Sequence, residues 1–342
     1  MKYLIGLIIG AALLGGGWYV LSELATNDTG DTDHHHEDDH TQAHELVARE
    51  PVRADGSFTI ATSFYPLQFA LERIAGAHAE IINIGAGRDP HDFRPSTHAI
   101  RTLQESDLVV LQGAGFEPWG EDVASQLTAS EVPLLTVMTA LHLADSGTAH
   151  DEDDEAENEN GHEEEHDHGQ FDPHTWLDPV LFSETIEHLA DTLATLDPEF
   201  ADIYMTNAAT LQAELAALDS QFQTRLTNCR YDHTIISHDA FGYLADRYHL
   251  TLHPIAGLST QDTPSATILA ELKAEAEEGV GAILLEESSV TAYGDTLARE
   301  TGLTTLSINP IAFAIPEGAT YLTLMEANLD TLVTAFACYE SE

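Results

Sequence analysis

The alternation of two kinds of segment limits the fold of this chain more than any other feature. From Phe58 onward, short runs rich in branched apolar residues alternate with longer segments whose apolar residues recur at helical spacing. The first pair is a predicted strand at 58–62 and a helix with Leu67 and Leu71 on one face. Strands and helices that alternate through short loops form parallel βαβ units. We therefore predict an α/β fold with mainly parallel sheets flanked by helices.

One long helical segment divides this alternation into two Rossmann-like lobes. Residues 198–226 are predicted to form one uninterrupted helix, with Asp197 as its N-cap and Pro198 at its first position. At 1.5 Å per residue it would extend about 43 Å and join both lobes as a stiff spine. The predicted regions are a membrane anchor or signal segment (1–25), a disordered acidic His-rich linker (26–55), an N-terminal α/β lobe (56–196) with an acidic His-rich insertion (145–170), the linking helix (197–228) and a C-terminal α/β lobe (229–342).

The N-terminus carries an export or membrane signal. Lys2 is followed by an uncharged run from Tyr3 to Ser22, long enough for one bilayer span. It has no convincing small-x-small cleavage site and no cysteine that could be lipidated, which favours an uncleaved anchor over a cleaved signal peptide. In both cases the rest of the chain is expected outside the cytoplasm, in the periplasm or its equivalent.

The charge of the chain excludes one class of partner and favours another. Twelve basic residues stand against 59 acidic ones, for a formal net charge of -47. Such a surface excludes nucleic acid, which requires a basic footprint, and favours cations. The stretches 31–44 and 145–168 combine acids with histidines and hold too few apolar residues to fold alone. They are either weak metal-collecting segments, whose ligands must be ordered on binding, or simply solvated acidic loops.

The two cysteines, Cys229 and Cys338, are well separated in sequence. In an exported chain an even pair favours a disulfide, here between the start of the last lobe and the C-terminal helix. The alternative is a pair of buried thiols.

Three histidines each lie at a predicted strand end or in an adjoining loop. His91 follows EIINIGAG, His174 lies in FDPHTWLDP, and His238 ends HTIISH. Ligands of α/β sheets collect at the carboxyl ends of strands. Three imidazoles suit zinc and leave one tetrahedral position for water, whereas three such rings buried without a cation would be left unpaired. The alternative is three ordinary core or surface histidines.

The motifs GRDPHDFRPS, FDPHTWLDP and SHDAFGYL occur in this order around the long helix. Together with GAGFEPW, TPSA, EESSV and TYLTLMEANLDTL, they resemble the zinc-binding proteins of metal-uptake ABC transporters, the cluster with a rigid helical backbone. The resemblance covers nearly all of residues 56–340. It implies a monomeric, non-enzymatic protein that captures Zn²⁺ between its lobes and delivers it to a membrane permease and its ATPase.

By this resemblance His91, His174 and His238 are the metal ligands. Histidine at the third place favours zinc, because manganese-binding relatives often have glutamate there. The chain departs from the pattern at Asn309, where those relatives have aspartate before proline. The fourth ligand is therefore open between water, Asn309 and Glu287, and we favour water.

Residues around these histidines are predicted to support the site. Asp172 or Asp178 would accept the outer N–H of an imidazole, and Asp239 could do so for His238. Three aromatic residues are expected to wall the cleft: Trp119, Trp176 and Phe241. Histidines without a motif are expected not to bind metal: His78, His98, His142, His188, His233, His249 and His253.

Two rival functions remain open. A manganese carrier or a metal-binding adhesin could have the same fold, and competitive metal loading distinguishes the carrier. A three-histidine zinc hydrolase would need a nucleophile or proton shuttle that the sequence does not indicate.

Overall fold

The computed structural model describes residues 58–143, 171–260, 262–286, 291–313 and 315–339. The predicted segments 1–25 and 26–55 and the insertion 145–170 lie outside these residues. Of the helices that are described, none combines the length and the hydropathy that a bilayer crossing requires.

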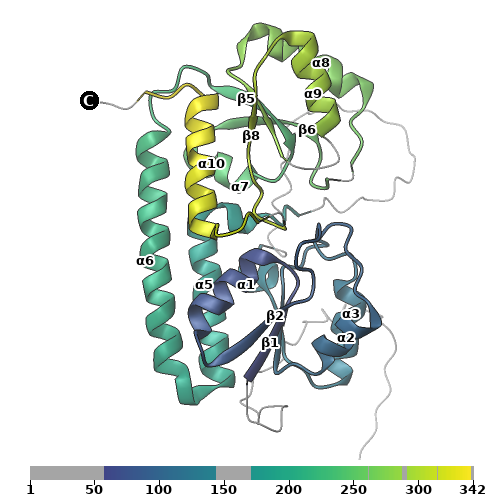
Figure 1. Cartoon of the computed structure of the whole chain (residues 1–342), viewed down its shortest axis with the longest axis vertical. Coiled ribbons are helices and arrows are strands. Elements are labelled where there is room, and N and C mark those ends of the chain that lie inside the picture. The colour runs from purple at the N-terminus through teal and green to yellow at the C-terminus, as the bar shows by residue number, and fades with distance from the viewer. Residues whose placement is uncertain (1–57, 144–170, 261, 287–290, 314, 340–342) are drawn as a thin grey trace, which may run out of the picture. The chain divides into compact units, whose positions relative to one another are not determined.

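The described residues form two parallel four-stranded sheets, one in each lobe (Figure 1). Both sheets have the same order, β2-β1-β3-β4 in the first lobe and β6-β5-β7-β8 in the second. The strands are β1 (Phe58–Thr62), β2 (Ala79–Asn83), β3 (Leu108–Leu111), β4 (Leu134–Thr136), β5 (His233–His238), β6 (Thr251–Ala256), β7 (Ile283–Leu285) and β8 (Thr305–Ser307). The predicted α/β class with parallel sheets is confirmed.

Helices connect most of the strands and cover both faces of each sheet. They are α1 (Tyr65–Ala75), α2 (Thr97–Gln104), α3 (Gly120–Ala129), α4 (Val137–Ala140), α5 (Pro179–Leu196), α6 (Ala201–Arg225), α7 (Gly242–Tyr248), α8 (Ala266–Gly279), α9 (Thr291–Thr301) and α10 (Tyr321–Ala335). Local signals explain several starts. Ser96 caps α2 by accepting the Ala99 N–H at 3.2 Å, and Thr320 forms a capping box with Thr323 at α10.

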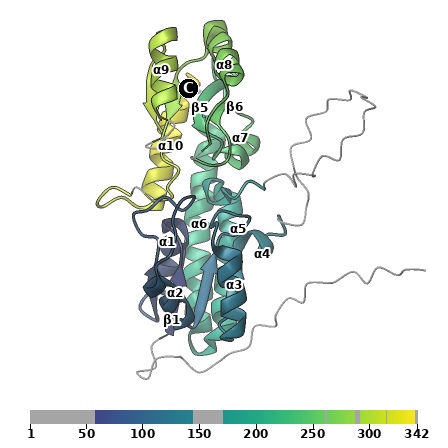
Figure 2. The ribbon, with the colours of Figure 1, turned by 90° about the vertical axis from the view of Figure 1, so that its right-hand side faces the viewer.

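Helix α6 is the structural link between the lobes. It continues from one lobe to the other in both views of the ribbon and packs against α1 in the first lobe and α10 in the second (Figures 1 and 2). At 1.5 Å per residue its length is about 38 Å. One stripe of this helix is buried, because its apolar residues recur every three or four positions: Tyr204, Ala208, Leu211, Leu215, Leu218 and Phe222.

The start of this segment differs from the prediction of one uninterrupted helix. Residues Pro198–Phe200 form a 3₁₀ turn, and α6 begins only at Ala201. Asp197 does not cap a backbone N–H. Its Oδ2 instead accepts the Tyr204 hydroxyl at 2.6 Å, which ties the turn to the first buried residue of α6.

The largest hydrophobic core extends through both lobes along α5 and α6, and each sheet has a smaller cluster on its outer face. Polar contacts add to this packing: Arg73 of α1 binds Glu214 at 2.9 Å, and Arg225 binds Asp330 of α10 at 2.8 Å. The expected disulfide is present between Cys229, just after α6, and Cys338, just after α10, with sulfurs 2.01 Å apart. It covalently links the chain just after α6 to the chain just after α10.

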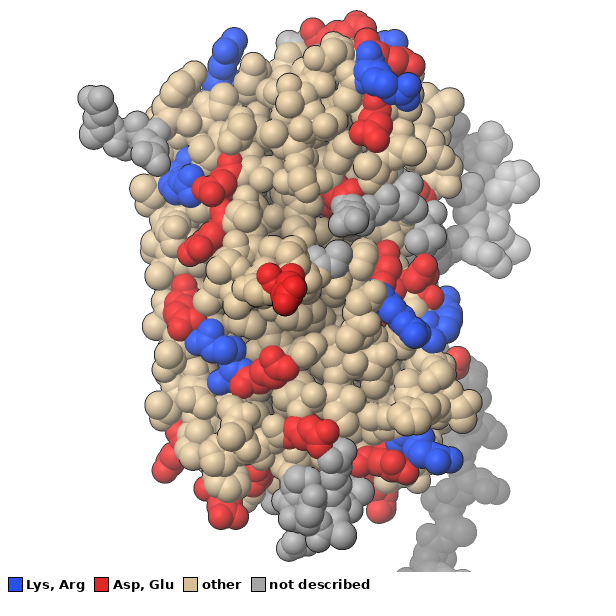
Figure 3. All heavy atoms as spheres, in the orientation of Figure 1, with Lys and Arg blue, Asp and Glu red and all other residues tan. Residues whose placement is uncertain are grey.

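Charged side chains on the face shown in Figure 3 are scattered. Most basic side chains on this face lie beside acidic ones and form no continuous basic patch there. This distribution agrees with the excess of acidic residues in the sequence.

Candidate metal centre

The structure brings together one histidine from each of three distant segments. His91 lies in the loop between β2 and α2, His174 directly before the 3₁₀ turn Thr175–Leu177, and His238 is the last residue of β5. One nitrogen of each ring lies within 4.8 Å of the others. Because His91 follows β2 and His238 ends β5, the carboxyl edges of the two sheets meet at this point.

The spacing of the rings suits a shared metal ion. The ring centroids of His174 lie 5.5 Å from those of both His91 and His238, and the remaining pair is 6.3 Å apart. The Nε2 atoms of His91 and His174 are 3.4 Å apart. Two nitrogens bound to one tetrahedral ion at about 2.0–2.1 Å are separated by about 3.3–3.4 Å, so this pair already has the separation of two ligands.

A carboxylate orients His174. Its Nδ1 lies 2.7 Å from Asp172 Oδ1, and the same oxygen accepts its backbone N–H at 2.9 Å. Because a carboxylate oxygen only accepts, Nδ1 carries the hydrogen and Nε2 keeps its lone pair for a metal. Asp172 thus has one of the two supporting roles that the sequence suggested.

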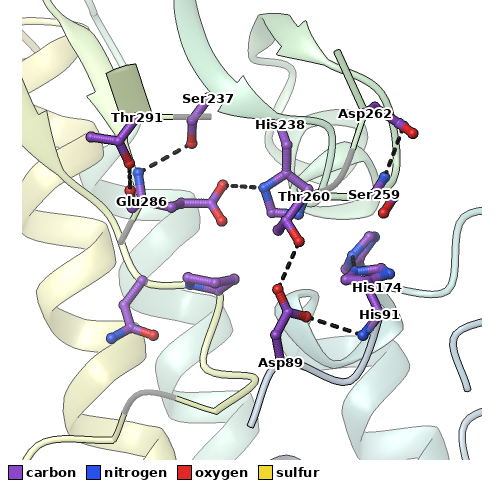
Figure 4. Close-up of polar contacts among 12 residues, drawn as sticks. Asp89, His91, His174, Ser237, His238, Ser259, Thr260, Asp262, Glu286 and Thr291 are labelled. Carbon is purple, nitrogen blue, oxygen red and sulfur yellow. Dashed lines mark hydrogen bonds and ion pairs between the residues drawn. The ribbon is translucent and has the colours of Figure 1, made fainter. Parts of the chain in front are cut away.

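A second carboxylate orients His238. Its Nδ1 lies 2.7 Å from Glu286 Oε1, and both side chains are buried (Figure 4). The Glu286 backbone N–H donates to Ser237 Oγ at 3.1 Å, which fixes the strand end that carries the acid.

Sequence reasoning proposed Asp239 for this position and missed Glu286. The signal that could have found it is the register of the two strands. Ile236 pairs with Leu284, so two residues further along the parallel strands His238 and Glu286 lie side by side.

A third carboxylate positions His91 and connects the lobes. Asp89 Oδ1 accepts the His91 backbone N–H at 3.0 Å. Its Oδ2 accepts the hydroxyl of Thr260, which belongs to the second lobe, at 2.7 Å (Figure 4). The loop that carries His91 is therefore fastened to the opposite lobe beside the centre.

Aromatic rings form the wall of the centre on the side of the first lobe. Phe116 lies edge-on to His91 with ring centroids 4.9 Å apart, and Trp176 lies 5.2 Å from His174. Phe64 packs on Phe116 and Trp176, with ring centroids 4.8 and 4.7 Å apart. The Trp176 indole N–H also donates to Pro310 O of the second lobe at 2.7 Å, so this wall contacts both lobes.

Two of the three predicted wall residues have other places. Trp119 packs on Phe93 at 6.1 Å in the outer cluster of the first lobe, and Phe241 is buried in the main core. Phe116 has the wall position that the sequence assigned to Trp119. The segment GAGFEPW contained it, but nothing in the pattern separated its phenylalanine from its tryptophan.

The remaining predicted candidates are also placed. Asp178 caps α5 through Val180 N–H at 2.8 Å and pairs with Arg247, so it supports that helix rather than an imidazole. Asn309 Oδ1 accepts the Ile311 N–H at 2.7 Å. Glu287 lies outside the described residues.

Burial keeps two of the imidazoles neutral. Desolvation, assisted by the neighbouring His174, lowers the pKa of His91 to about 3. Desolvation and nearby His238 likewise hold the pKa of His174 well below its usual value. Burial is the largest single influence on His238 and acts in the same direction, but the charge and hydrogen bond of Glu286, together with the charges of Asp89 and Asp239, raise the pKa of His238. Two rings are thus ready to bind a cation, and the third carries a carboxylate partner that compensates positive charge.

Comparisons with known proteins find zinc-binding relatives. Residues 60–335 match the family described as "Zinc-uptake complex component A periplasmic". The "Zinc-binding lipoprotein AdcA" of Streptococcus pneumoniae serotype 4 is 33% identical over 286 residues, covering 82% of this chain and 56% of that protein. The "High-affinity zinc uptake system protein ZnuA" of Bacillus subtilis is 31% identical over 279 residues, covering 80% of this chain and 86% of that protein. The chain thus spans about half the length of the AdcA relative.

Solved structures show the same likeness. The Zn(II)-bound ZnuA-like domain of Streptococcus pneumoniae AdcA superposes with a TM-score of 0.66 at 30% identity, covering 82% of this chain and 99% of that one. The laminin-binding adhesin Lmb of Streptococcus agalactiae, in a mutant form, gives 0.70 at 27% identity, covering 82% and 100%. The match to the family over 60–335 carries the conclusion: this chain belongs to the family of periplasmic zinc-uptake complex components A.

Proposed function

We propose that this protein captures Zn²⁺ between its lobes through His91, His174 and His238 and delivers it to the permease and ATPase of an ABC importer. The observation that carries the proposal is the meeting of three imidazole nitrogens within 4.8 Å, two of them at the separation of ligands on one ion. The family and the zinc-binding names of the relatives support the same cargo.

Zinc suits this centre better than manganese. All three candidate ligands are imidazoles, and the carboxylates nearest to them, Asp172 and Glu286, are engaged at the Nδ1 atoms of their rings. Nitrogen ligands favour zinc, whereas manganese prefers carboxylate and water oxygens. We propose water as the fourth ligand. Competitive loading with equal zinc and manganese should leave zinc in the protein, and retained manganese would refute this assignment.

The protein acts outside the cytoplasm as a monomeric carrier, held at the membrane by residues 1–25. The family description as periplasmic supports this location. We propose carriage rather than catalysis. A zinc-loaded sample that hydrolysed activated esters or hydrated carbon dioxide, and lost this activity with its zinc, would favour a hydrolase instead.

Elemental analysis of alanine variants tests the ligand set. After dialysis against a chelator of intermediate strength, which strips the His-rich segments 31–44 and 145–168, the native protein should retain one zinc per chain. His91→Ala, His174→Ala and His238→Ala should each lose it. The matched control is His98→Ala, an exposed histidine of α2, which should retain zinc. Retention of zinc by the three alanine variants would exclude this centre.

A second candidate function is adhesion. It is supported by the likeness to the laminin-binding adhesin, whose fold matches with a TM-score of 0.70. Binding of immobilised laminin by the purified chain, with and without zinc, tests it. Absence of binding in both states would remove this candidate and leave the carrier function untouched.

A further inference from the structure

Two histidines without any motif in the sequence lie together at the far end of the second sheet. His233 is the first residue of β5, and His253 is the third of β6. Ile235 pairs with His253, and His233 precedes Ile235 by two residues, so strand alternation puts both imidazoles on one face of the sheet. Their ring centroids are 5.5 Å apart and the ring planes are inclined by 39°.

Each of these rings is oriented by its own carboxylate. His233 Nδ1 lies 2.7 Å from Asp232 Oδ1, and His253 Nδ1 lies 2.6 Å from Glu275 Oε2 of α8. This is the arrangement that metal-binding histidines usually have, with the outer N–H donated to a carboxylate and the other nitrogen left as a ligand. The chain uses the same device for His174 and His238.

The side chains of both histidines are partly exposed to solvent. The side chains of His233 and His253 are 24% and 33% exposed. Among the described residues, both carboxylate contacts are made by Nδ1, and neither Nε2 takes part in a hydrogen bond. An ion arriving from solvent could therefore reach them.

The ring spacing fits a shared ion. Two imidazoles bound at about 2.0–2.1 Å through a near-tetrahedral angle have centroids about 5–5.5 Å apart. The observed 5.5 Å equals two of the centroid distances in the three-histidine centre. His233 lies five residues before His238 on β5, about 17 Å along the strand, so this pair is separate from that centre.

We infer that His233 and His253 form a second zinc site, in which the two Nε2 atoms bind one Zn²⁺ and waters complete its coordination. The carboxylates of Asp232 and Glu275 orient the rings and balance the charge of the ion. Two protein ligands at a partly exposed position hold zinc less tightly than three ligands of which two are buried, so this site fills after the three-histidine centre. Each Nδ1 contact is a hydrogen bond that a neutral imidazole can donate, and such a ring keeps the Nε2 lone pair for a metal.

Histidine footprinting on the full chain tests this site directly. Carbethoxylation modifies free imidazole nitrogens, and peptide mass spectrometry reports each histidine separately, so the His-rich segments do not obscure the result. With rising zinc, His233 and His253 should lose reactivity together, by about tenfold at saturation, at a higher zinc concentration than the half-buried His91 of the main centre. His249, an exposed histidine of the same lobe, is the internal control and should stay reactive.

The variant His253→Asn tests whether His233 and His253 bind the same ion or respond to zinc separately. In this variant zinc should no longer protect His233, while it should still protect His91, which shows that the main centre is intact. Should the variant not fold, Glu275→Gln replaces it and should shift the protection midpoint of His233 to about tenfold higher zinc. Protection of His233 that survives His253→Asn, an unshifted midpoint in Glu275→Gln, or full reactivity in the native chain at millimolar zinc would each overturn the inference. Failure of the main centre would appear separately, as a reactivity of His91 that zinc does not change.

Discussion

Each imidazole of the main centre is placed by one acidic residue. Asp172 and Glu286 hold the outer nitrogens of His174 and His238, and Asp89 holds the backbone of His91. A metal-bound histidine with a fixed tautomer and a fixed ring loses little freedom on binding. We therefore expect the three acids to contribute to zinc affinity without contacting the ion.

Glu286→Gln tests this contribution. The amide keeps the size of the side chain but removes the charge that compensates the cation and raises the basicity of His238. We expect zinc affinity to fall about 10- to 100-fold. Chelator competition measures the change. Glu121→Gln, an exposed glutamate of α3, should leave affinity unaltered, and an equal loss in both variants would mean that Glu286 has no specific role.

The pH dependence of zinc binding follows from the unequal imidazoles. Below its raised pKa, His238 carries a proton that zinc must displace, whereas the lowered pKa values keep His91 and His174 neutral far into the acid range. Affinity should thus weaken on acidification, by about tenfold per pH unit between about pH 5 and 6.5, with one proton released per ion. Calorimetry in two buffers of different ionisation enthalpy, with less than one equivalent of zinc, counts the protons. Release of three protons would contradict the unequal assignment.

At the scale of elements, the loop after β3 shows how backbone conformation serves the centre. Gly113 has φ of 86°, and a Cβ there would lie 2.3 Å from Thr136 Cγ2. Glu117 fastens the loop by accepting the backbone N–H groups of Gln112 and Gly113 at 3.0 Å. The loop then delivers Phe116 against His91.

Gly113→Ala and Gly115→Ala form a matched pair for this loop. Both glycines have positive φ, so each substitution costs about 1–2 kcal/mol of backbone free energy. Only Gly113 also meets a side chain, since nothing lies within 4 Å of a Cβ at Gly115. Gly113→Ala should therefore lower the free energy of unfolding by about 1–3 kcal/mol more than Gly115→Ala. Urea denaturation of the metal-free proteins measures both, and equal losses would refute the steric argument.

Most of the secondary structure follows from the sequence. The predicted strands and helices are present, because apolar periodicity and caps such as Ser96 are local signals. Local reasoning was wrong at Asp197, whose carboxylate has a better partner in the tertiary structure, the hydroxyl of Tyr204. It missed Glu286 because the neighbour of His238 is set by the register between β5 and β7, which no single segment contains.

At the scale of the whole molecule, the order of motifs predicted that three histidines meet, but not what holds them there. The contacts between the lobes, Asp89 to Thr260 and Trp176 to Pro310, join residues 171 and 134 positions apart. Such pairs follow from how the lobes pack on α6. No local sequence pattern around any of these four residues indicates its partner in the other lobe. The helix itself was predictable, because its apolar stripe is regular over its whole length.

The continuous α6 should restrict motion between the lobes. A helix packed into both lobes leaves no flexible segment along the spine at which a wide hinge could open. Spin labels at Glu121 in α3 and Thr296 in α9, both exposed, should therefore show a distance change of less than about 2 Å on zinc binding. Pulsed electron resonance measures this distance, and a change of 5 Å or more would indicate hinge closure.

The proposed zinc centre requires three distant imidazoles to share one ion between the lobes. Anomalous diffraction at the zinc absorption edge, from crystals of the zinc-loaded chain, locates that ion. We predict the strongest peak about 2.0–2.1 Å from one nitrogen each of His91, His174 and His238. Zinc bound elsewhere in the crystal with no peak among these three rings would contradict it.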